Sequence, residues 1–452
     1  MTHKLQAFRG ALVDFVGDPN ELGDNACRSF ADGVLVVRDG RVENIGPAHE
    51  LLAQLPPEVN VIDYRGRLIL PGFVDTHIHY AQTDMIGSYG EQLLAWLENY
   101  TFPTERAFED PDHAREVAGF FVEELLRNGT TTAMVFATVH RNSVDAIFEA
   151  AATRDLCLVA GKVMMDRNCP QFLRDTPASS YEDGSALIER WHGKGRLRYA
   201  VTPRFAPTSS DAQLTVAARL LDEHPGVHLQ SHAAENPQEV RWVAELFPWS
   251  RSYLDVYDRF GLLRERAVFA HCIHLDEADR RRLAASGAAA SFCATSNLFL
   301  GSGLFDVQRA AEAGMRVGIG TDVGAGTSFS MLRTLDECYK VTQLAGQRLS
   351  PLRAFYLATL GGARSLYLDD TIGNFEAGKY ADFVVLDPQA TPLLARRMAH
   401  MQRLADRLFL LLTLGDDRAV AATYVAGRAV HARAGSGARD SAHRGQNCLQ
   451  MP

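Results

Sequence analysis

Two histidines separated by one residue, His77 and His79, follow an apolar stretch in the first fifth of the chain. The stretch from Leu68 to Val74 is typical of a buried strand, and residues i and i+2 of a strand point to the same side. Both imidazoles can therefore reach one ion, and neutral histidine is a common nitrogen ligand of zinc and similar metals. A His-x-His pair alone is also compatible with two unrelated surface residues, so the rest of the chain has to decide.

Further residues suited to metal binding and proton transfer follow other apolar stretches. In chain order they are Arg204, Phe205, His232, Glu235, His271 and Asp322. Three histidines and one aspartate suffice to hold a divalent ion while one position stays open for water or substrate. The alternative is that His232 is a hydrogen-bonded core histidine and Asp322 a helix cap.

Such a set needs a scaffold that brings distant strand ends together. Eight short apolar runs alternate with amphipathic stretches such as Asp112–Arg127 and Asp211–Glu223. The runs are Leu68–Val74, Thr130–Ala137, Leu156–Met164, Leu197–Thr202, Val227–Gln230, Ala267–Ala270, Ala288–Cys293 and Arg316–Gly320. This alternation predicts an α/β protein with a (β/α)8 TIM-like barrel, whose sites lie at the C-terminal ends of the strands. A doubly wound open sheet is the competing architecture.

The two ends of the chain have a different, β-rich pattern. Asp32-Gly33 and Asp39-Gly40 stand between strand-like runs and predict hairpins. Similar runs return between residues 381 and 431. We therefore expect a small β-sandwich domain built from residues 1–68 and 373–432, with the catalytic barrel at 69–372. Residues 433–452, rich in Gly, Ser, Ala and Arg, are expected to form a flexible tail.

The composition restricts the partners and the compartment. The 452 residues carry a net charge of −9, which argues against a nucleic-acid partner. No apolar run approaches the ~18 residues of a membrane helix, and the polar N-terminus is not typical of a signal peptide. Seven cysteines without a Cys-x-x-Cys pair indicate free thiols. We expect a cytoplasmic protein that does not bind membranes.

The motifs together carry a family resemblance. They are Pro-Gly-Phe-Val-Asp-Thr-His-Ile-His at 71–79, Ser-His-Ala-Ala-Glu at 231–235, Ala-His-Cys-Ile-His-Leu at 270–275, Thr-Ser-Asn-Leu at 295–298 and Gly-Thr-Asp-Val-Gly-Ala-Gly-Thr-Ser-Phe-Ser-Met at 320–331. With them the sequence resembles the metal-dependent deaminase branch of the amidohydrolase superfamily, from about residue 5 to 431. The pattern His-x-Glu with Pro-Cys-x-x-Cys, which marks the other class of zinc deaminases, is absent from the sequence.

The resemblance implies roles for individual residues. One divalent metal ion per subunit, zinc or alternatively iron, would be held by His77, His79, His232 and Asp322. His271 would stand beside the metal-bound water, and Glu235 would be the proton shuttle. The purine would be held by Gln82, Arg204 and Phe205, and would also contact His232, Glu235, His271 and Asp322. The resemblance further implies a homodimer.

The reaction that the resemblance implies is the hydrolysis of guanine to xanthine and ammonia, a step of guanine breakdown. Metal-bound hydroxide would attack C2 while Glu235 and Asp322 divide the acid and base work. The planar donors of Arg204 match the O6 and N7 acceptors of guanine. The alternatives are a related aminohydrolase or chlorohydrolase that acts on cytosine, an adenosine-type substrate or a triazine, and, more remotely, a non-catalytic scaffold.

Overall fold

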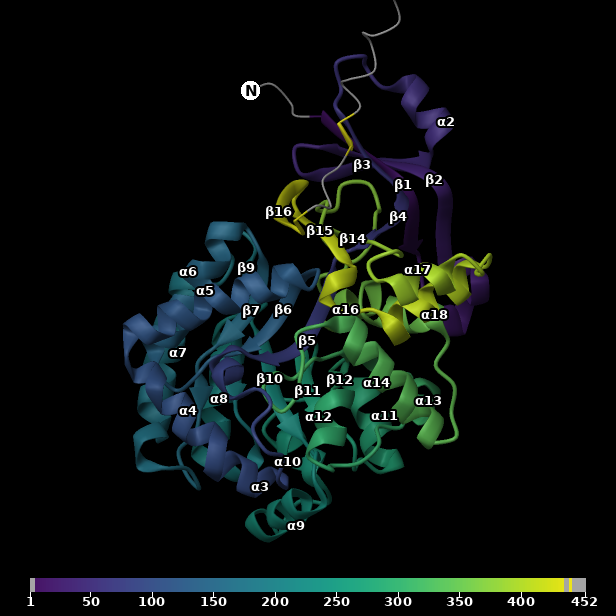
Figure 1. Ribbon diagram of the computed structural model, residues 1–452. Coiled ribbons are helices and arrows are strands. Elements are labelled where there is room, and N and C mark those ends of the chain that lie inside the picture. The colour runs from purple at the N-terminus through teal and green to yellow at the C-terminus, as the bar shows by residue number, and fades with distance from the viewer. Residues whose placement is uncertain (1–4, 435–438, 441–452) are drawn as a thin grey trace, which may run out of the picture.

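A computed structural model describes residues 5–434 and 439–440 of the protein (Figure 1). The chain forms two sheets, one of which is parallel and surrounded by helices, while the other combines strands from both ends of the chain. No helix within the described ranges is both long and apolar enough to cross a membrane.

The parallel sheet is the barrel that the sequence predicts. Its principal strands are β5 (Phe73–His79), β6 (Thr130–Phe136), β7 (Cys157–Gly161), β9 (Leu197–Pro203), β10 (His228–Ala233), β11 (Ala267–His271), β12 (Ala289–Phe292) and β13 (Arg316–Ile319), and the short β8 (Val163–Met164) pairs with β9. Neighbouring strands pair in parallel from β5 to β13. The prediction of a (β/α)8 barrel is confirmed.

The chain just after β13 closes the barrel onto β5. The backbone N–H of Asp322 donates to the carbonyl of His77 at 2.9 Å. The buried Asp75 accepts hydrogen bonds from the backbone N–H groups of Thr321 and His77, both at 3.1 Å. The two edges of the parallel sheet are therefore joined at the end of the barrel where the strands finish.

The helices surround the barrel, except for the short helix Ala48–Leu51, which packs against the second sheet (Figure 1). They are α1 (Pro19–Leu22), α2 (Ala48–Leu51), α3 (Leu93–Trp96), α4 (Phe102–Arg106), α5 (Pro111–Arg127), α6 (Arg141–Arg154), α7 (Pro177–Trp191), α8 (Asp211–Glu223), α9 (Pro237–Leu246), α10 (Tyr253–Arg259), α11 (Glu277–Ser286), α12 (Ala294–Phe299), α13 (Val307–Glu312), α14 (Met331–Leu344), α15 (Pro351–Leu357), α16 (Leu360–Ser365), α17 (Pro392–Met398) and α18 (Leu404–Leu414). In α5, Asp110 caps the first turn, and Val117, Phe121 and Leu125 recur at four-residue spacing and are buried. This spacing gives the helix one apolar face for the core.

The second sheet combines both chain ends, as predicted. Its strands are β1 (Leu5–Phe15), β2 (Cys27–Arg38), β3 (Arg41–Pro47), β4 (Val61–Pro71), β14 (Phe383–Leu386), β15 (Val420–Val425), β16 (Arg428–Ala432) and β17 (Arg439–Asp440). Figure 1 shows the purple N-terminal strands beside the yellow C-terminal ones. The rings of Phe383 and Tyr424 stack with centroids 4.3 Å apart, and Phe8 packs edge-on against Tyr424. Aromatic side chains from both ends of the sequence thus form one core.

Two local predictions about strands differ from the structure. The apolar run Leu68–Val74 is not one strand, because β4 ends at Pro71 and β5 begins at Phe73. The pair Asp39-Gly40 does form the hairpin between β2 and β3, with φ of 52° and 81°. The pair Asp32-Gly33 lies inside β2, since β2 pairs with β1 along almost its whole length.

The predicted tail falls largely outside the described residues. Within it, residues 439–440 pair antiparallel with Ile62 and Asp63 of β4. The domain limits at residues 68, 372 and 432 stay predictions.

Gly72, between β4 and β5, is the residue at which the chain passes from one sheet to the other. A Cβ atom at this position would lie 2.0 Å from Oγ1 of the buried Thr131. We expect Gly72→Ala to lower the free energy of unfolding by about 1–3 kcal/mol, because overpacked cores must shift. Gly119→Ala is the control, since the new Cβ would meet nothing within 4 Å in the exposed face of α5. Denaturant unfolding of both variants checks this, and equal stabilities would contradict it.

Candidate active site

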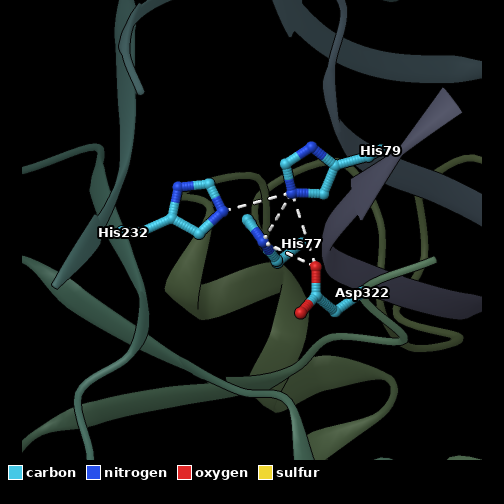
Figure 2. A group of neighbouring side chains, drawn as sticks. All are labelled: His77, His79, His232 and Asp322. Atoms are coloured by element: carbon cyan, nitrogen blue, oxygen red, sulfur yellow. Dashed lines mark hydrogen bonds and ion pairs between the residues drawn. The ribbon is translucent and has the colours of Figure 1, made fainter. Parts of the chain in front are cut away.

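Four side chains from distant parts of the chain meet at the end of the barrel where the strands finish (Figure 2). His77 and His79 lie on β5, His232 lies on β10, and Asp322 follows β13. The Nε2 atom of His79 is 3.2 Å from Nε2 of His77 and 3.1 Å from Nε2 of His232. Oδ1 of Asp322 is 3.1 Å from Nε2 of His77.

The protonation states of this group suit metal binding. Nδ1 of His232 lies 2.7 Å from the carbonyl oxygen of Arg204 and must donate its proton there, so Nε2 presents a lone pair to the other three residues. Burial lowers the pKa of His77, and it lowers those of His79 and His232 much further. Burial opposes the ionised form of Asp322, but the adjacent histidines outweigh it and hold the pKa of that carboxyl below its usual range.

The geometry of the group fits one ion. The four ligand atoms all lie within 4.8 Å of one another. Zinc binds nitrogen and oxygen at about 2.0–2.2 Å, so atoms spaced in this way can surround a single ion. Neutral imidazoles together with one carboxylate are donors that zinc and iron both accept. A divalent metal therefore fits the residues that are present.

A second carboxylate stands next to this group. Nε2 of His271 is 3.3 Å from Oε2 of Glu235 and 3.7 Å from Oδ2 of Asp322. Asn297 Oδ1 accepts from Nδ1 of His271 at 2.8 Å, and Ser302 donates to Oε1 of Glu235 at 3.0 Å. Burial raises the pKa of the Glu235 carboxyl to about 7. A group with that pKa can both give and take a proton near neutral pH.

The backbone is strained at the same place. His271 and Asp322 adopt φ angles of 69° and 51°, and Ala234 adopts 51°. These angles belong to the left-handed region. A residue other than glycine that adopts this conformation carries a conformational strain of order 1–3 kcal/mol. Strain of this kind persists where the surrounding structure enforces it, which is common at functional sites.

The group opens into a pocket. Its lining residues are His79, Gln82, Leu93, Trp96, Leu97, Thr101, Arg204, Phe205, His232, Glu235, His271, Ser296, Leu300, Asp322 and Ala325. Every residue that the sequence analysis assigns to the site lines this pocket, with the exception of His77. That residue contacts two lining residues, His79 and Asp322. Apolar side chains such as Trp96 and Phe205 thus share the pocket with convergent polar and charged groups, a combination that small-molecule sites use to bind and orient a ligand.

The sequence analysis assigned no role to several residues that shape this site. Asn297 and Ser302 hold His271 and Glu235, and only Asn297 belongs to a motif quoted for the family. Trp96 of α3 lines the pocket, and Glu105 of α4 lies behind it against Arg204. No motif marks these two, and the short apolar run Leu93–Leu97 in which Trp96 lies does not distinguish a pocket residue from one that packs in the core.

Comparison with known proteins places the chain in a family. Residues 68–430 match the Amidohydrolase family, and the chain belongs to it. The guanine deaminase of Escherichia coli (strain K12) is 54% identical over 434 residues, which cover 95% of this chain and 99% of the relative.

Two solved structures are similar to the whole barrel and second sheet. That of E. coli guanine deaminase has a TM-score of 0.93 at 54% identity and covers 95% of this chain and 100% of its own. A guanine deaminase from C. acetobutylicum with guanine bound in the active site has a TM-score of 0.85 at 30% identity, covering 94% and 100%.

Proposed function

We propose that this protein is a hydrolase that converts guanine and water to xanthine and ammonia. The observation that carries the proposal is the meeting of three features in one pocket. These are the four-residue metal group, the buried carboxyl of Glu235 and the guanidinium of Arg204. The relatives named as guanine deaminases, which span nearly the full chain, support guanine as the substrate.

We further propose that one zinc ion per subunit, with iron as the alternative, is held by His77, His79, His232 and Asp322. When bound, a divalent ion supplies a nucleophile at neutral pH, since it lowers the pKa of water to about 7. We expect elemental analysis to find about one ion per chain and a chelator to abolish turnover. Restoration by zinc but not by iron would select the metal, and full turnover by metal-free protein would contradict this proposal.

The chain's own residues supply the proton transfers. We assign to Asp322 the acceptance of the proton lost by the attacking water. We assign to Glu235 the delivery of its proton to the ring nitrogen beside C2, a role that its pKa of about 7 supports. Glu235 then takes up the hydroxyl proton of the C2 adduct and gives it to the leaving amine, and the proton held by Asp322 returns to Glu235 at the end of the cycle. His271, held by Asn297, would stabilise the negative oxygen that develops at C2.

The remaining pocket residues would bind and orient the purine. Arg204 and Gln82 present donors to the acceptor edge of the ring that carries O6 and N7. Phe205 would contact the ring face, since aromatic rings prefer offset or edge-on packing. Together these contacts would fix C2 beside Glu235.

Ammonia release from guanine by metal-replete protein tests the function, with cytosine, adenine and a triazine assayed in parallel. Release from guanine alone, with xanthine identified chromatographically, is the expected result. Release from another ring only would keep the site but reassign the pocket. No release from any of them with the metal bound would favour an untested substrate or the non-catalytic scaffold.

The quaternary structure and compartment are also proposals. We propose a homodimer in the cytoplasm, where the enzyme would take part in guanine breakdown. The six cysteines that the described ranges contain are all free thiols, which suits a reducing compartment. Light scattering coupled to gel filtration tests the dimer.

A further inference from the structure

Glu105 is a fully buried carboxylate to which the proposed chemistry assigns no role. Both of its oxygens accept from Nη1 of Arg204 at 2.9 Å, and its Oε1 also accepts from Nε2 of Gln82 at 3.2 Å. It belongs to α4, which crosses the region between β5 and α5. The two residues that we assign to the purine edge therefore share one carboxylate.

These contacts fix both side chains and leave donors for a ligand. The Gln82 amide is held at both ends, because Gly324 N–H donates to its Oε1 at 3.2 Å. The Arg204 guanidinium also lies 5.6 Å from the ring centroid of Phe102, one turn before Glu105 on the same helix. Within the described part of the chain, Nε and Nη2 of Arg204 have no hydrogen-bond partner.

Glu105 itself does not line the pocket, whereas Arg204 and Gln82 do. It acts on a ligand only through those two side chains. A buried carboxylate and a buried guanidinium are each costly without the other, so the pair keeps the charge of Arg204 compensated at the pocket wall.

We propose that Glu105 is a positioning residue that aims Arg204 and Gln82 at a 6-oxo group and thereby sets a preference for 6-oxopurines. The inference rests on the proposed function and names the specificity element of the same pocket. A site built to hydrogen-bond one group rejects analogues that lack it, because its buried donors then stay unpaired.

Two unreactive ligands isolate this role. Hypoxanthine carries O6 and N7 and purine carries only N7, and neither has an amine at C2 to release. Their dissociation constants are measured by calorimetry on zinc-loaded wild-type protein and Glu105→Gln. We expect wild-type protein to bind hypoxanthine at least about tenfold more tightly than purine. In Glu105→Gln the dissociation constant of hypoxanthine should rise about tenfold or more, and that of purine by less than about threefold.

Two further variants control for a purely structural effect. Glu105→Asp keeps the charge, but its side chain is too short to hold both partners. The affinity for hypoxanthine should therefore fall by about three- to tenfold, and this variant keeps the test open if Glu105→Gln does not fold. Asp382→Asn is the matched control, because Asp382 pairs with Arg196 just before β9, whereas Glu105 pairs with Arg204 just after it. That variant should lose stability while both affinities stay unchanged.

The outcomes separate this inference from the proposed function. Wild-type protein that does not bind hypoxanthine more tightly than purine would overturn the role of Glu105. Equal weakening of both ligands, or of neither, in the folded Glu105 variants would do the same. Failure of wild-type protein to deaminate guanine would instead overturn the proposed function.

Discussion

The variant Glu235→Gln is expected to release ammonia from guanine about 10²–10⁴-fold more slowly than wild-type protein, with unchanged metal content. The amide oxygen can still accept the hydrogen bond from Ser302, so the side chain keeps its place, but the amide cannot exchange a proton. Glu235 is outside the four-residue metal group, which is why the ion should remain. The turnover number and elemental analysis of the same sample check both parts.

The matched control for this variant is Glu245→Gln. Glu245 is exposed on α9 and does not line the pocket around the metal group. The same change of charge there should leave turnover within about twofold of wild type, as for most surface substitutions. Near-normal turnover by Glu235→Gln would remove Glu235 from the proposed mechanism.

Removal of a metal ligand should have the other large effect. We expect His77→Ala to lose its ion and to reduce turnover by more than about 100-fold, because even changes outside the coordination shell cost about 10–100-fold in metal affinity. Elemental analysis of protein dialysed against metal-free buffer measures the ion. The control is His49→Ala, whose imidazole is exposed far from the pocket. Full metal occupancy in His77→Ala would refute the proposed ligand set.

The candidate site could be predicted to a large extent because the fold follows a simple rule. In a parallel barrel all strands finish at the same end, so polar residues that follow apolar runs must approach one another. His232, His271 and Asp322 follow or end such runs. The structure brings His232 and Asp322 into contact with the His77–His79 pair, and His271 contacts Asp322. The prediction needed the order of strands and helices but no side-chain detail.

Glu105 shows where this rule stops. It pairs with Arg204 across 99 residues of sequence, and it lies on a short helix in a segment without periodicity. Nothing local distinguishes a glutamate that is fully buried against an arginine from one that is exposed, as Glu245 is. Such a contact follows only from the packed tertiary structure.

The two Asp-Gly pairs make the same point for the backbone. Asp39-Gly40 forms a hairpin and Asp32-Gly33 does not, although their local chemistry is the same. Asp32 forms an ion pair with Arg9 of the neighbouring strand, at 2.6 Å. Strand pairing outweighs the turn preference there, and the sequence around the dipeptide does not reveal the pairing.

The seam that closes the barrel has a consequence for assembly. It joins Asp75 to Thr321 across 246 residues, and the proposed ligands His77 and Asp322 lie on its two sides. An ion held by both would act as a cross-link over this long loop. At a free concentration 100 times its dissociation constant it would stabilise the closed ring by about 2.7 kcal/mol. Contacts between such distant segments are slow to form. A nascent chain that ends before residue 322 therefore cannot complete this binding site. Metal uptake would then indicate that the barrel has closed.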